Sequence, residues 1–78
     1  MKVNETDSAK KYILKRGLYK QYKKAKTKIQ KGQLSQVDFK KRKPLNENLY
    51  QFKINKRFRA FCVKNDKGLI VIRISDHQ

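Results

Sequence analysis

Cationic side chains alternate with apolar ones in three segments of the second half of the chain, a pattern typical of strands. These segments are residues 49–54, 58–63 and 69–75. Because side chains two residues apart share a face of a strand, Lys53, Arg59 and Arg73 should share one face of a sheet with Phe61. Arginine and lysine hold phosphates, and an exposed phenylalanine can stack a nucleobase. This face therefore predicts binding of single-stranded RNA.

The two faces of the predicted sheet differ in character. The cationic face also carries Gln51, Val63, Val71, Ser75 and His77, with Arg57 near the first turn. The other face is apolar and should be buried under helices; it comprises Tyr50, Phe52, Ile54, Phe58, Ala60, Cys62, Ile70, Ile72 and Ile74. A polar outer face is also ordinary for an antiparallel sheet. However, all three strands place cations on this face, and none of its residues before Asp76 is acidic. This favours a binding surface over an ordinary solvent-exposed face.

The charge balance points to a polyanionic partner. The chain has 22 lysine and arginine residues against 6 aspartate and glutamate residues, which gives a formal net charge of +16. A field of this size attracts nucleic acid, an anionic membrane surface or an acidic protein. We favour nucleic acid over a membrane, because the helical apolar residues are needed for the core and the chain has no tryptophan for a membrane interface.

The single cysteine and the N-terminal sequence bear on the compartment. Cys62 has no second cysteine to pair with in the chain, which favours a reducing environment. It lies in an apolar strand pattern, and the only histidine is His77, so a buried structural thiol is favoured over a nucleophile. No apolar run reaches about 18 residues, and the N-terminus lacks the apolar core of a signal peptide. We therefore expect a cytoplasmic protein.

The first half of the chain has the pattern of one amphipathic helix or a helical hairpin. Residues 6–8 can cap its start, Gly32 can end it, and Gly17 can divide it. Its apolar stripe is Leu14, Leu18, Tyr22, Ala25 and Ile29. The opposite face is mostly lysine, namely Lys15, Lys20, Lys23, Lys24, Lys26 and Lys28. Such a face is usually only solvated, but the scarcity of carboxylates also allows it to flank a phosphate track.

A short second helix is expected around residues 35–41, followed by a basic run that ends before Pro44. Arg42 and Lys43 in this run are further candidates for RNA contact. Together the elements predict one α+β domain over residues 1–78, with an N-terminal helix or helical hairpin on one face of a three-stranded antiparallel sheet. Residues 1–8 have almost no apolar periodicity, and disorder is left open for them.

From residue 43 onward, the order of motifs resembles the C-terminal half of the RelE/ParE toxin superfamily. The motifs are Lys43-Pro44-Leu45, Leu49-Tyr50, Ile54, Phe58-Arg59 and the isoleucine-rich strand that ends at Asp76-His77. In that family a proline–leucine segment leads into a hairpin whose second strand opens with an arginine, and the last strand ends near a histidine or tyrosine. Members begin with a strand before the first helix, which the opening residues here do not predict.

The resemblance implies a RelE-like toxin of a bacterial toxin–antitoxin pair, an endoribonuclease that cleaves mRNA at the ribosome and inhibits translation. Its implied partners are ribosome-bound mRNA and a cognate antitoxin with an acidic or amphipathic segment, without a membrane or a cofactor. Metal-independent cleavage needs a base, an acid and cations on the phosphate. The implied catalytic residues are Arg59, His77 and Arg73, and the implied RNA contacts are Lys53, Arg57, Phe61, Lys43 and Arg42.

Two alternatives stay open beside the ribonuclease. The family's catalytic glutamate and tyrosine are matched here by Lys43 and Gln78, which leaves room for a non-catalytic RNA-binding or ribosome-binding module on the same scaffold. A ParE-type toxin, which inhibits gyrase, needs no RNA chemistry, and the presence of His77 mildly disfavours it. The salt dependence of binding separates RNA binding from a toxin that acts on gyrase, because the affinity of phosphate contacts falls steeply as salt rises.

Overall fold

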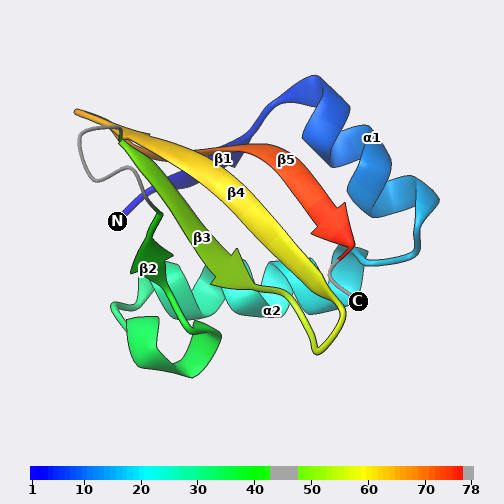
Figure 1. The fold of residues 1–78 in the computed structure, drawn as a ribbon, viewed down its shortest axis with the longest axis horizontal. Helices are drawn as coiled ribbons and strands as arrows, with labels where there is room; N and C mark the ends of the chain where they lie inside the picture. Colours follow the sequence, from blue (N-terminus) through cyan, green and yellow to red (C-terminus); the bar gives the residue numbers. More distant parts are fainter. Residues whose placement is uncertain (43–47, 77–78) are drawn as a thin grey trace.

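The computed structural model describes residues 1–42 and 48–76, which form two helices on one face of a five-stranded mixed sheet (Figure 1). The helices are α1 (Asp7–Lys15) and α2 (Tyr19–Gln30), followed by one 3-10 turn, η1 (Leu34–Val37). The strands are β1 (Val3–Glu5), β2 (Lys40–Lys41), β3 (Leu49–Lys53), β4 (Phe58–Asn65) and β5 (Gly68–Asp76). Their order in the sheet is β1-β5-β4-β3-β2.

The predicted α+β class is confirmed, and the expected description of the sheet is wrong in two respects. The antiparallel strands β3, β4 and β5 match the three predicted segments. However, β1 pairs in parallel with β5, and β2 pairs with β3, so the sheet has five strands and is mixed. Strand β1 is only three residues long and β2 consists of two exposed lysines, so neither has enough apolar alternation to be recognised.

The helical region forms the predicted hairpin. The Thr6 side-chain oxygen accepts a hydrogen bond from the Ala9 N–H at 3.2 Å and so caps α1, as the sequence indicated. Gly17, with φ of 68°, divides the two helices. The single apolar stripe is wrong at Leu14, which is 54% exposed, because α1 follows a different axis and buries Ala9 and Ile13 instead.

A β-bulge changes the expected alternation along β5. Phe61 pairs with Arg73 and Cys62 with Val71, so Ile72 has no partner in the ladder. Because of this one extra residue, the side chains of β5 that precede Ile72 point to the opposite face of the sheet from the one that strict alternation predicts. Val71 is therefore fully buried and Ile72 exposed, with Ile70 half-buried opposite Val63. The assignment of Ile70 and Ile72 to the buried face and of Val71 to the open one is wrong for this reason.

Strand β1 is anchored at both of its ends, so the disorder left open for residues 1–8 is not observed. Val3 is only 2% exposed. The carbonyl of Lys2 accepts a hydrogen bond from the Leu69 N–H at 2.8 Å, beside Gly68. Gly68 has φ of 132° and lies so close to this carbonyl that any Cβ would collide with it. The side chain of Glu5 then ties β1 to α2.

Glu5 accepts hydrogen bonds from two residues of α2. The Tyr22 hydroxyl donates at 2.6 Å and the Lys26 ammonium at 3.3 Å. Burial, the hydrogen bond to Glu5 and the charge of Glu5 together raise the pKa of Tyr22, which keeps the phenol a donor. These side-chain bonds join the three-residue strand β1 to α2, in addition to its backbone pairing with β5.

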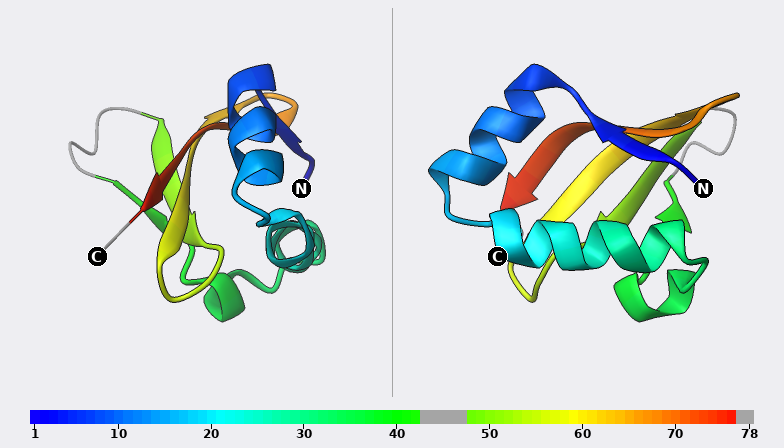
Figure 2. Two further views of the ribbon diagram at one scale, coloured as in Figure 1. Left: turned by 90° about the vertical axis from the view of Figure 1, so that its right-hand side faces the viewer. Right: turned by 180° about the vertical axis from the view of Figure 1, so that it is seen from behind.

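The core lies between the sheet and the two helices, which cover the same side of it (Figure 2). Its largest fully buried side chains are Phe52, Ile13, Ile29, Leu69, Val71 and Cys62. Cys62 is buried, as the sequence predicted, and this burial raises the pKa of its thiol to about 12. Within residues 1–42 and 48–76, no helix is long and apolar enough to span a membrane.

The Tyr22–Glu5 bond gives a first prediction. Tyr22→Phe keeps the buried ring but removes a donor to a charged carboxylate, so the free energy of unfolding should fall by about 1.5 kcal/mol. Urea denaturation measures this change. Tyr19→Phe is the control, because Tyr19 is 48% exposed and its substitution should stay within about 0.5 kcal/mol. Equal small changes in both variants would show that the bond does not hold β1.

Candidate nucleic-acid interface

We call the face of the sheet opposite α1 and α2 the open face (Figure 2, left). The predicted cations of the three central strands lie in neighbouring positions of it. Two rows of cross-strand neighbours define it. One row is Gln51, Phe61 and Arg73, and the next is Lys53, Arg59 and Ser75. The bulge at Ile72 puts Arg73 and Ser75 on this face although Val71 is buried. Lys53, Arg59 and Arg73 thus occupy neighbouring positions of the sheet, as the sequence predicted, although Arg59 alone of the three lines the hollow described next.

A hollow of about 400 Å³ lies on the open face toward β2. It is lined by the cations Lys40, Lys41, Arg42 and Arg59 and by Gln51, Phe61 and Ser75. Its volume lies in the range of ligand-sized pockets, and its lining contains no carboxylate among the described residues. We call it the arginine pocket. Its electrostatics favour an anion.

Arg59 is the least satisfied polar group of the arginine pocket. Its side chain is 21% exposed, and its Nη1 atom is shielded from solvent without a hydrogen-bond acceptor among the described residues. Asp38 forms an ion pair with this atom at 3.7 Å, beyond hydrogen-bond distance. A buried donor without an acceptor is costly. Because the Arg59 side chain is still 21% exposed, an oxyanion in the pocket can reach the accessible part of this under-satisfied guanidinium.

Asp38 is a site residue that sequence reasoning did not single out. It follows η1 in a left-handed conformation with φ of 51°, which aspartate tolerates better than most residues. Its carboxylate lies 3.6 Å from the Lys40 ammonium and 3.7 Å from Arg59, and it is 56% exposed. Asp38 therefore places one negative charge beside the cations where a ligand oxyanion would compete with it.

Phe61 does not present the open ring that was expected for base stacking. It is only 6% exposed, because the guanidinium groups of Arg42 and Arg73 lie over its ring at 4.4 Å and 4.7 Å from the centroid. The Arg42 Nη1 also donates to the Gln51 Oε1 at 2.9 Å. The surface offered to a ligand is therefore a pair of positioned guanidinium groups. Such planes stack nucleobases and bind phosphates.

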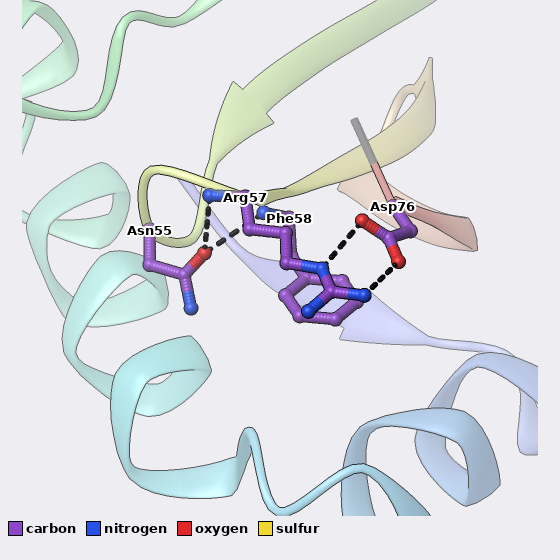
Figure 3. Close-up of polar contacts among 4 residues, drawn as sticks. All are labelled: Asn55, Arg57, Phe58 and Asp76. Carbon is purple, nitrogen blue, oxygen red and sulfur yellow. Dashed lines mark hydrogen bonds and ion pairs between the residues drawn. The ribbon is translucent and has the colours of Figure 1, made fainter. Parts of the chain in front are cut away.

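Two other predicted contacts lie away from the arginine pocket. Lys53 is the register partner of Arg59 but lines a separate hollow beside α2. Arg57 donates two hydrogen bonds to the Asp76 carboxylate at 2.8 Å and 2.7 Å, and its guanidinium lies 5.4 Å from the Phe58 ring centroid (Figure 3). Since Asp76 already neutralises it, Arg57 stabilises the end of the sheet and does not line the pocket.

The structure does not bear on two of the predicted site residues. Lys43, a predicted RNA contact, and His77, a predicted catalytic residue, lie outside the described residues. Their roles remain predictions. Arg42, by contrast, extends the pairing of β2, because its N–H donates to the Leu49 carbonyl at 2.8 Å, and this backbone bond helps to position its side chain over the pocket.

Comparison with known proteins gives no relative: no family model, no curated protein and no solved structure matches the chain. The resemblance to the RelE/ParE superfamily therefore remains a prediction from the motifs quoted above. Function is inferred below from the charges, contacts and shape of the open face.

The Arg57–Asp76 pair predicts a pH dependence of stability. The hydrogen bonds from Arg57 lower the pKa of Asp76 below its ordinary value. A carboxyl whose pKa is depressed in the folded state stabilises the fold above the unfolded value of about 3.9, and this contribution disappears as the pH falls through the folded pKa. Asp76→Asn should therefore lower the melting temperature at pH 7, and the difference from wild type should shrink below about pH 4.

Thermal unfolding followed by circular dichroism at several pH values measures this effect. Asp66→Asn is the matched control, because Asp66 is exposed in the β4–β5 turn and forms no ion pair among the described residues. A difference between Asp76→Asn and wild type that stays constant from pH 7 to pH 2 would contradict the role of the charged pair.

Proposed function

We propose that the open face binds single-stranded RNA, with the arginine pocket holding a backbone phosphate. The observation that carries the proposal is Arg59, whose side chain lines a cationic hollow, is 21% exposed there, and has a hydrogen-bond donor, Nη1, without an acceptor among the described residues. A phosphate oxygen supplies that acceptor and is more highly charged than a neutral carbonyl. Charge-assisted hydrogen bonds of guanidinium to phosphate are about twice as strong as neutral ones.

The surroundings of Arg59 favour RNA over an isolated small anion. Arg42 and Arg73 lie over the Phe61 ring and expose guanidinium groups that can stack bases next to a bound phosphate. The hollow is open, so a chain can enter and leave it. The net charge of +16 adds a long-range attraction and a large gain from counterion release.

We further propose that the RNA is mRNA on the ribosome and that the chain is a RelE-like endoribonuclease silenced by an acidic antitoxin. The three-residue strand β1 before α1 supports this, since members of that family begin with a strand. Arg59 is the second residue of β4, in keeping with the arginine that opens the corresponding family strand. In this proposal Arg59 and Arg73 stabilise charge on the phosphate, and His77 transfers a proton.

The phosphate contact predicts opposite effects of two substitutions on RNA affinity. Arg59→Gln removes a charge-assisted donor, worth about 1.5–3 kcal/mol, so affinity for a single-stranded oligonucleotide should fall about tenfold to a hundredfold. Asp38→Asn removes the competing carboxylate and should strengthen binding. Fluorescence anisotropy at several salt concentrations measures both, and the salt slope of Arg59→Gln should fall by about 0.7.

Arg16→Gln serves as the control, because Arg16 is exposed at the end of α1 and lies over Tyr12 on the helical side. It removes the same charge and should change affinity much less than Arg59→Gln. If both arginine variants weaken binding equally, RNA is held by net charge alone. If Asp38→Asn weakens binding, the carboxylate does not compete with a phosphate in the pocket.

The ribonuclease proposal is tested by translation in a bacterial cell-free extract with wild type, Arg59→Gln and His77→Ala. Wild type should stop translation and leave new mRNA 5′ ends inside ribosome-bound messages, and both variants should abolish most of this cleavage. Intact mRNA together with tight RNA binding would leave the non-catalytic module. Inhibited DNA supercoiling by gyrase, without RNA binding, would instead favour the ParE-type toxin.

A further inference from the structure

A second cationic hollow lies on the helical side of the molecule, between α2, η1 and the turn that joins β3 to β4. Its volume is about 400 Å³, equal to that of the arginine pocket. Four lysines surround it: Lys24 and Lys28 from α2, and Lys53 and Lys56 from the hairpin. We call it the lysine hollow. Figure 2 (right) shows α2 above η1 with the hairpin turn beside them.

The lysine hollow concentrates positive charge without internal neutralisation. Its lining contains no carboxylate, and none of its four lysines takes part in an ion pair among the described residues. By contrast, Lys26 on the same helix is paired with Glu5. Four like charges around one depression raise the local potential and attract a polyanion. The glutamines of the rim, Gln21 and Gln36, add hydrogen-bonding groups.

The walls of the lysine hollow are held together by the β3–β4 turn. The Asn55 side-chain amide donates to the Gln21 side chain on α2 at 2.5 Å. The Asn55 Oδ1 accepts from the backbone N–H groups of Arg57 and Phe58, both at 2.8 Å (Figure 3). The apolar part of the lining consists of buried Ala25, Val37 and Ile54. The hollow is therefore already formed before any ligand binds.

The lysine hollow adjoins the arginine pocket through one pair of residues. Lys53 lines the lysine hollow, and its register partner Arg59 lines the arginine pocket. Directly opposite residues of antiparallel strands have Cβ atoms about 5 Å apart, so the two cationic surfaces meet at this pair. At Lys53, β2 no longer pairs with β3, because its two residues face Tyr50 and Gln51.

We propose that the lysine hollow is a second phosphate-binding site for the same RNA strand, which passes from Arg59 over Lys53 onto α2. This inference rests on the proposed RNA binding by the open face. The occupant is an RNA backbone because the four lysines come from α2, β3 and the β3–β4 turn, and because Lys53 is the direct strand neighbour of Arg59 in the arginine pocket. Lysine ammoniums act as point charges for phosphates and impose no base specificity.

The consequence is a footprint that depends on RNA length. A short oligonucleotide fills the arginine pocket alone, whereas a longer one also reaches α2. In Lys24→Gln/Lys28→Gln, affinity for a 16-nucleotide oligouridylate should fall several-fold, and the salt slope should drop by about 1.4, because each lysine–phosphate ion pair adds about 0.7 to it. Affinity for a 4-nucleotide oligouridylate should equal that of wild type. Arg59→Gln should weaken binding of both.

The matched control is Lys11→Gln/Lys15→Gln, which removes two exposed lysines of α1 that do not line the lysine hollow. All substituted lysines are on helices and glutamine keeps the helix propensity, so circular dichroism should show equal folding. An equal decrease in the control, or an equal decrease for the 4-nucleotide and 16-nucleotide probes, overturns the second site. Absence of RNA binding by wild type would overturn the proposed function itself.

Discussion

The bulge at Ile72 is the constraint on which both surfaces of the sheet depend. Strict alternation along β5 would place Arg73 on the same face as Leu69 and Val71, which are buried in the core. The extra residue lets β5 bury Leu69 and Val71 at one end and Ile74 at the other, and still present Arg73 and Ser75 to solvent. Without it, either apolar side chains of β5 would leave the core or Arg73 would leave the open face.

Three of the few carboxylates of the chain form contacts between separate segments of the fold. Glu5 ties β1 to α2, Asp76 ties the last strand to the β3–β4 turn, and Asp38 stands beside Arg59. The first two residues stabilise the fold, whereas Asp38 occupies the edge of the arginine pocket. With three of the six acidic residues in these pairs, most of the cationic surface is left for a polyanion.

The sequence predicted the parts of the fold that extend over several residues. Helices α1 and α2, their break at Gly17 and the meander of β3, β4 and β5 followed from caps, glycines and alternation, as did the shared face of Lys53, Arg59 and Arg73. The short helix expected around residues 35–41 is wrong, because this segment forms η1 and then β2. What it did not predict depends on contacts between distant residues. Strand β1 is recognisable only through its pairing with β5, and the bulge only through the ladder.

The same limit applied to the candidate site. Phe61 was placed on the correct face, but its cover by Arg42 comes from the end of β2, a strand of two lysines without a periodic signal. Asp38 meets Arg59 because η1 turns the chain back through a left-handed residue, which no pattern of apolar residues reveals. Local periodicity therefore located the cations, and only tertiary structure showed which of them remain unsatisfied.

The pairing of β1 with β5 also orders the folding of the chain during its synthesis. Val3 is made before its partner Leu69, which leaves the ribosome only after the helices and the first hairpin have been translated. Such long-range pairing is slow, and β1 cannot dock before β5 has been made. Before β1 pairs with β5, Val3 and Leu69 are not covered by each other's strand. Chaperone binding or aggregation of the nascent chain would therefore be concentrated in this late step.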